Sequence, residues 1–201
     1  MRTLWIRAVV VFVLWISAAP ANAAIIVTFD DLTGEGLVPD GYGGIQWGSG
    51  WFHYDFSQPP YTPHSPPQRI GNFCTSNDCS YFSFVGASQV FEGAWFSGFG
   101  SLSNRSNKVH FELFRNSVLV ATSGNLFPSA TPAFLPSDYS GLVDMVHVVS
   151  DLGDYYTMDD VTYTTAVIPE PCTALLLCSG LAAVALKRCN RRGERPDTDT
   201  L

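Results

Sequence analysis

Residues 108–122, KVHFELFRNSVLVAT, contain the pattern that decides the fold. From Val109 to Leu113 apolar side chains alternate with polar ones, and this period of two predicts a strand that buries one face. An Asn-Ser pair follows at 116–117, and a second apolar run occupies 118–122. The stretch therefore predicts an antiparallel β-hairpin with a short turn.

Segments of the same kind recur through the middle of the chain. They are short runs rich in Val, Ile, Phe, Tyr and Thr between clusters of Gly, Pro, Asn and Ser, and none has the period of an amphipathic helix. The expected strands are 25–29, 45–54, 81–85, 91–99, 108–115, 118–122, 144–150 and 155–165. Prolines predict surface loops at 58–68 and 126–140. This spacing predicts an all-β, two-sheet sandwich of jelly-roll-like topology.

The N-terminus has the three parts of a cleavable signal peptide. Arg2 and Arg7 form a basic start, 8–16 is an apolar run, and 21–23 is the small triplet Ala-Asn-Ala. The apolar run is too short to span a bilayer, which takes about 20 residues. We therefore expect cleavage after Ala23 and a mature chain outside the cytoplasm.

The C-terminus carries a second targeting pattern. Pro169, Glu170 and Pro171 are followed by an apolar run at 174–186. Four basic residues come next: Lys187, Arg188, Arg191 and Arg192. The prolines keep the motif extended, the apolar run suits a membrane, and the basic cluster suits the cytoplasmic side under the positive-inside rule.

This order of parts resembles the PEP-CTERM protein-sorting signal, which is also catalogued as an ice-binding protein C-terminal domain. The resemblance covers about residues 167–192. It implies an exosortase-type enzyme that cuts near the Pro-Glu-Pro motif, after the hydrophobic helix has held the protein in the inner membrane. The mature domain is then expected at the cell surface or outside the cell.

Four segments are expected along the chain. They are a signal peptide at 1–23, an exported β-sandwich domain at 24–166, a PEP-CTERM sorting segment with a hydrophobic helix at 167–192, and a polar tail at 193–201. Residues 24–168 contain 14 Asp and Glu against four Lys and Arg, a balance of ten negative charges. Such a surface repels phosphates, so nucleic acid is not an expected partner.

Two cysteines lie in the exported domain, Cys74 and Cys79. Because exported proteins meet an oxidising environment, we expect a disulfide that closes a local loop. A zinc site would require further Cys or His at characteristic spacing nearby, and the sequence has none.

Two Asp-Asp pairs stand near the ends of the domain, Asp30-Asp31 and Asp159-Asp160. In jelly-roll carbohydrate-binding modules the first and last strands often lie together, and the terminal strands of this sequence look similar. Carboxylates brought together there would suit a structural Ca²⁺, which prefers hard oxygen ligands. The alternative is that they are solvated strand ends, because consecutive strand residues point to opposite faces.

Trp47 and Trp51 lie in a region rich in aromatic residues beside the proline-rich loop. One interpretation is a platform on which sugar rings stack; the other is that the indoles fill the sandwich core. The four histidines are scattered, and no Ser, Cys or carboxylate stands in a recognisable nucleophile motif. Glu92 and Glu112 would form a glycosidase pair only if the fold held their carboxyl groups about 5 to 9.5 Å apart.

These observations lead to a function hypothesis. The chain is expected to be an exported cell-surface or extracellular-matrix protein, not an enzyme, whose sandwich acts in adhesion or in association with exopolysaccharide in a biofilm. Two alternatives remain, a carbohydrate-binding module in the strict sense and a secreted glycan-active enzyme. The expected partners are an exosortase-type processing enzyme, a polysaccharide and, before processing, the membrane.

Overall fold

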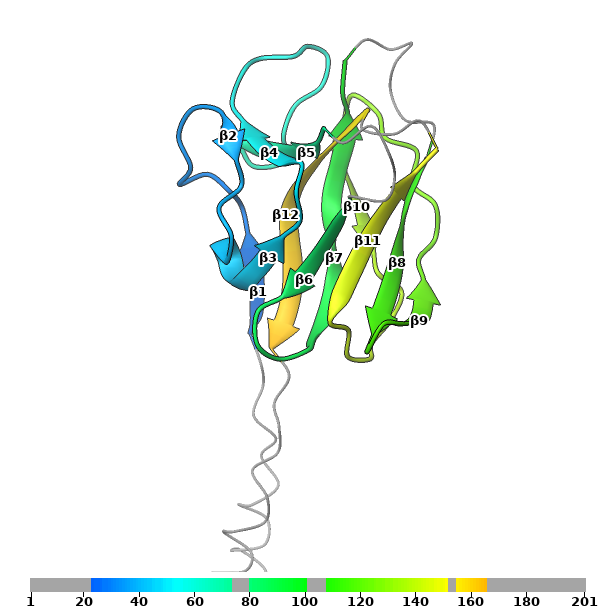
Figure 1. The fold of residues 1–201 in the computed structure, drawn as a ribbon. Helices are drawn as coiled ribbons and strands as arrows, with labels where there is room; N and C mark the ends of the chain where they lie inside the picture. Colours follow the sequence, from blue (N-terminus) through cyan, green and yellow to red (C-terminus); the bar gives the residue numbers. More distant parts are fainter. Residues whose placement is uncertain (1–22, 74–79, 101–107, 152–154, 166–201) are drawn as a thin grey trace, which may run out of the picture. The chain divides into compact units, whose positions relative to one another are not determined.

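The computed structural model describes residues 23–73, 80–100, 108–151 and 155–165, which form an all-β domain of two antiparallel sheets (Figure 1). The chain divides into two compact units, Met1–Ala166 and Val167–Leu201, and all of these residues belong to the first. None of them forms a helix with the length and apolar character needed to cross a membrane. The expected signal peptide, the cysteine pair and the sorting segment lie outside the described residues.

The larger sheet has seven strands in the order β10-β7-β12-β5-β4-β2, with β1 paired to β12. Its strands are β1 (Ala24–Val27), β2 (Gly36–Leu37), β4 (Trp51–Tyr54), β5 (Arg69–Asn72), β7 (Gln89–Gly98), β10 (Ala133–Pro136) and β12 (Tyr156–Thr165). The pairing of β1 with β12 runs antiparallel from Ala24 opposite Thr164 to Val27 opposite Val161. The first and last strands of the domain therefore lie side by side.

The smaller sheet has five strands in the order β3-β6-β11-β8-β9. Its strands are β3 (Ile45–Trp47), β6 (Tyr81–Phe84), β8 (Val109–Arg115), β9 (Val118–Thr122) and β11 (Met145–Ser150), and a single 3-10 turn, η1 (Tyr42–Gly44), precedes β3. The predicted hairpin is confirmed as β8 and β9. Asn116 and Ser117 have φ values of 50° and 61°, as a type I′ turn requires at both central positions.

The expected strand at 45–54 is wrong, because the structure divides it between the two sheets. Trp47 ends β3 in the smaller sheet and Trp51 begins β4 in the larger one. Gly48, Ser49 and Gly50 form the connection, and Gly50 has a φ of 102° that favours glycine. The chain therefore crosses from one sheet to the other inside what looks like one apolar run.

Three strands were not expected from the sequence. β2 and β5 have only two and four residues, which gives no clear period. β10 lies within the loop expected at 126–140, between Pro132 and its own last residue, Pro136. β10 is an edge strand, and edge strands tolerate proline because one side needs no backbone donors.

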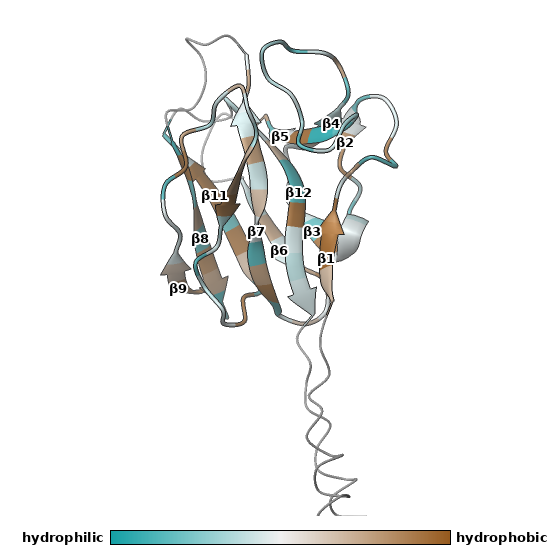
Figure 2. Ribbon diagram, turned by 180° about the vertical axis from the view of Figure 1, so that it is seen from behind, coloured by the Kyte–Doolittle hydropathy of each residue, from teal (hydrophilic) through white to brown (hydrophobic). Residues whose placement is uncertain are grey.

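Aromatic side chains fill the space between the sheets. Phe111 of β8 lies against Phe91 and Phe96 of β7, with ring centroids 4.8 and 5.6 Å apart. Trp51 of β4 lies 6.3 Å from Phe82 of β6. Figure 2 shows apolar and polar residues alternating along β7 and β8, so each strand gives one face to this core.

Candidate functional site

The second Asp-Asp pair lies at an irregularity of β12. The register of β12 against β7 shifts between Asp159 and Thr162, and Asp160 has a φ of 46°, in the left-handed region. A bulge of this kind re-aims side chains. Both carboxylates therefore reach the same neighbour, although residues adjacent in a regular strand point to opposite faces.

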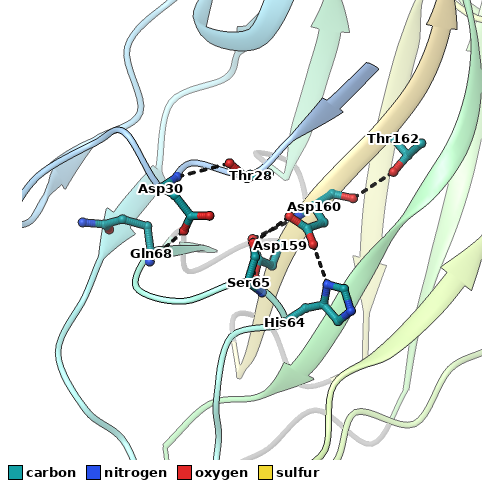
Figure 3. Close-up of polar contacts among 8 residues, drawn as sticks. All are labelled: Thr28, Asp30, His64, Ser65, Gln68, Asp159, Asp160 and Thr162. Atoms are coloured by element: carbon teal, nitrogen blue, oxygen red, sulfur yellow. Dashed lines mark hydrogen bonds and ion pairs between the residues drawn. The ribbon is translucent and has the colours of Figure 1, made fainter. Parts of the chain in front are cut away.

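That neighbour is Ser65, in the proline-rich loop between β4 and β5 (Figure 3). The Ser65 N–H donates to Asp159 Oδ2 at 2.8 Å, and its hydroxyl donates to Asp160 Oδ1 at 2.7 Å. Asp159 Oδ1 also accepts the backbone N–H of Asp160 at 2.8 Å. These bonds hold the loop against β12.

His64 makes a second connection between the loop and the sheet. Its Nδ1 lies 2.5 Å from Asp160 Oδ2. Its ring stacks on Trp95 of β7, with centroids 3.5 Å apart and planes 11° from parallel. His64, Ser65 and the two aspartates thus form one polar cluster on the outer face of the larger sheet.

The first Asp-Asp pair is divided between two places. Asp30 faces the cluster, and its Oδ1 accepts the N–H of Gln68 at 3.4 Å. Asp31 is exposed and accepts a hydrogen bond from the Tyr42 hydroxyl. The structure therefore places Asp30 near enough to Asp159 to raise the pKa of that carboxyl, while Asp31 is held by η1.

Burial changes the acid–base chemistry of this cluster. Asp159 is 2% exposed, and removal from water raises its pKa to about 8, with further upward contributions from the charges of Asp160 and Asp30. The hydrogen bonds from Ser65 and Asp160 act in the opposite direction. At neutral pH the Asp159 carboxyl is consequently protonated in the folded protein.

The carboxylates are held by protein donors rather than gathered around one point. In the ranges that the structure describes, no group of three or more His, Cys, Asp or Glu side chains is placed to hold a metal ion. A Ca²⁺ at this position would require Asp160 to exchange its contacts with His64 and Ser65 for the ion. The calcium site stays a prediction, and its test is given below.

Trp47 and Trp51 belong to the core, so the prediction that they offer a sugar platform is wrong. They are 3% and 1% exposed. Their indole N–H groups donate to the carbonyls of Tyr42 and Tyr81 at 3.0 and 2.8 Å. A ring buried on both faces cannot stack on a sugar, which leaves the core interpretation of these residues.

Glu92 and Glu112 do not form a glycosidase pair. Glu92 lies on β7 in the larger sheet and accepts a hydrogen bond from Thr164. Glu112 lies on β8 in the smaller sheet, 3.1 Å from His147 Nδ1. Each carboxylate is held by a neighbouring strand of its own sheet.

The sequence did not indicate His64, Ser65 or Gln68 as partners of the aspartates. One signal was present, because Pro63, Pro66 and Pro67 flank the two polar residues and proline restricts the backbone around them. Such a segment presents its side chains in few conformations. A comparison of the chain with protein-family models finds no matching family, and a comparison with curated proteins finds no match.

Proposed function

We propose that this chain is an exported cell-surface or extracellular-matrix protein, sorted by an exosortase-type enzyme, whose non-catalytic sandwich acts in adhesion or exopolysaccharide association. The observation that carries the proposal is the pairing of β1 with β12, from Ala24 opposite Thr164. Both ends of the domain therefore leave it at one pole, and the proline-rich loop lies at the other (Figure 1). This arrangement suits a domain that is attached at the pole where its two ends lie. The proline-rich loop at the other pole would then face the surrounding medium.

The proposal includes a jelly-roll topology for the domain. The strand orders β5-β12-β7-β10 and β6-β11-β8-β9 support it, because the chain changes sheets repeatedly between β5 and β12, as in two interleaved Greek keys. Jelly rolls occur in lectin domains, although fold alone does not establish function. The other support for a surface location comes from the predicted signal peptide at 1–23 and the predicted sorting segment at 167–192.

The sorting proposal predicts a shortened mature protein. Protein from the native host should begin near Ala24 and lack the residues beyond about Pro171, because the signal peptide and the sorting segment are removed during export. Intact-mass measurement of the surface fraction checks both ends. A surface-located chain that still ends at Leu201 would contradict processing at the Pro-Glu-Pro motif.

Adhesion itself is tested by complementing a deletion strain. The full chain should restore surface attachment, whereas a chain ending at 166 should fold and be exported but should be found in the medium. If both chains restore attachment equally, the sorting segment is not needed to place the protein at the cell surface. Cys172 directly follows the Pro-Glu-Pro motif, and a control chain in which it is changed to Ser (Cys172→Ser) should behave as the full chain does.

The calcium prediction concerns the carboxylates around Asp160. An ion that binds only the folded state stabilises it by RT ln(1 + [Ca²⁺]/Kd), about 2.7 kcal/mol at a hundredfold excess over Kd. We expect the melting temperature to rise with Ca²⁺, and more strongly above pH 8 than at pH 6, because a metal binds the deprotonated carboxylate.

The calcium response should be lost in Asp160→Asn. Asp40→Asn is the matched control, because Asp40 is exposed and lies outside the cluster. Melting curves that are the same in EDTA and in millimolar Ca²⁺ at both pH values would leave these aspartates as hydrogen-bond acceptors for the loop.

A further inference from the structure

The outer face of β4 carries exposed aromatic side chains. Trp51 faces the core, so the next residue, Phe52, points to the opposite face of the sheet. Phe52 pairs with Leu37 of β2, and cross-strand partners share a face. The Phe52 ring lies 5.7 Å from Phe73, which in turn lies 5.5 Å from Phe99. Phe73 is 43% exposed and Leu37 is 67% exposed, so this apolar surface is open to solvent.

Phe56 extends this surface beyond the end of β4. Its ring stacks on Tyr54, with centroids 4.7 Å apart and planes 21° from parallel. Tyr54 is 0% exposed, whereas Phe56 is 38% exposed. A ring that covers a buried ring on one side presents its other side to water. Tyr54 also lies 6.0 Å from Phe73, which makes the surface continuous.

We refer to this surface as the aromatic patch, and its members are Leu37, Phe52, Phe56, Phe73 and Phe99. Contiguous exposed apolar patches mark interaction or ligand-binding surfaces. Figure 1 shows β2, β4 and β5 at the pole away from the two ends of the domain. In a domain attached at its ends, the aromatic patch is therefore on the side that meets external partners.

Exposed carboxylates flank the aromatic patch in the sequence. Asp55 directly precedes Phe56. Glu35 directly precedes β2, and Asp40 follows its last residue, Leu37, by three positions. All three carboxylates are exposed. A partner that covers the patch therefore meets negative charge at its rim.

The basic side chains in the described part of the chain do not cancel this charge. They are Arg69, Lys108 and Arg115. Arg69 is 2% exposed and shares a side-chain hydrogen bond with Tyr54. Lys108 precedes β8 and Arg115 ends it, in the smaller sheet. Three exposed carboxylates thus stand against one buried guanidinium.

We propose that the aromatic patch binds a polysaccharide whose amino sugars carry free ammonium groups. The C–H face of a sugar ring is apolar and can lie flat on an exposed phenyl ring such as that of Phe56. Ammonium groups are attracted both to the faces of aromatic rings and to the carboxylates at the rim. A uronate polymer would be repelled by the same carboxylates, and a neutral glycan would gain the ring contacts alone. The proposal rests on the surface function proposed above and names the class of polysaccharide.

Calorimetric titration of the purified protein with a glucosamine hexamer tests the proposal. We expect saturable binding that weakens as sodium chloride is raised, because salt screens the attraction between exposed charges. The N-acetylglucosamine hexamer keeps the sugar rings and lacks the positive charge, so its affinity should be lower by about tenfold or more. Absence of binding by the glucosamine hexamer, or equal binding by the acetylated one, would overturn the proposal. A lysine hexamer that binds as tightly as the glucosamine hexamer would also overturn it, since the patch would then suit a basic protein.

Variants make the test specific to the aromatic patch. Phe73→Ala and Phe56→Ala remove exposed rings, so each should fold and should lower the affinity for the glucosamine hexamer by about tenfold. Leu119→Ala is the matched control, because Leu119 is 49% exposed but lies on β9 of the smaller sheet. Asp55→Asn should weaken binding and reduce its dependence on salt. Unchanged affinity in both phenylalanine variants would contradict the proposed site.

The binding site and the surface function can fail separately, because the titration requires neither export nor sorting. A full chain that restores surface attachment but does not bind the hexamer overturns the amino-sugar proposal and leaves the surface function intact. A chain that binds the hexamer but does not restore attachment supports the binding site and contradicts the surface function.

Discussion

Phe111→Ala is expected to lower the free energy of unfolding by about 3 to 5 kcal/mol, the usual cost of removing a fully buried aromatic ring. Phe111 is 0% exposed. Its ring joins the two sheets through the contacts with Phe91 and Phe96 of β7. Since domains are typically stable by about 5 to 15 kcal/mol, the variant should be close to unfolding at room temperature.

Urea unfolding of the purified protein measures this effect. The midpoint should fall while the slope with denaturant stays constant, as for a change in stability alone. Phe127→Ala is the matched control, because Phe127 is 68% exposed, and it should change stability by no more than about 0.5 kcal/mol. A loss below about 1 kcal/mol in Phe111→Ala would contradict a core shared by both sheets.

Stability is expected to fall as pH rises from about 4 to 8, and Asp159 is the cause. The pKa of Asp159 rises from its ordinary value of 3.8 to about 8 on folding. Between these values the folded state keeps a proton that the unfolded state releases. Stability then decreases with pH, by at most about 1.4 kcal/mol per pH unit, and levels off above the folded pKa.

Asp159→Asn should remove most of this slope. The two backbone N–H groups bond to different oxygens of Asp159, so the single amide oxygen of the variant can accept from only one of them. The variant should lose some stability at low pH, but its stability should change much less with pH because the side chain no longer titrates. The difference between the two proteins reports on the Asp159 carboxyl. Urea midpoints from pH 4 to 9 give the comparison, with Asp40→Asn as control, and parallel curves would contradict the assignment.

The hairpin at 108–122 could be predicted because the residues that determine it are neighbours in the sequence. Alternation sets the buried face of β8, and an Asn-Ser pair permits two successive positive φ values. The break between Trp47 and Trp51 is different, because its turn lies within a continuous apolar run. Which sheet receives each half is decided by distant partners, Phe82 for Trp47 and Asn72 for Trp51.

The aspartate cluster could be predicted only in part. The sequence indicated that the first and last strands would bring Asp30 near Asp159 and Asp160, and the pairing of β1 with β12 does so. The rule that neighbouring strand residues face apart argued against a shared site. A single left-handed residue, Asp160, reverses that rule. Aspartate adopts this conformation more readily than most non-glycine residues, but the sequence does not indicate which of the aspartates does so.

The position of β12 also governs when the domain can fold. β12 is the last strand of the domain, yet it lies between β7 and β5 and also pairs with β1. Until residues 156–165 have been synthesised, the larger sheet lacks its centre and β1 has no partner. A chain with so many long-range pairings folds slowly. We therefore expect the larger sheet to assemble only after the whole domain has left the ribosome.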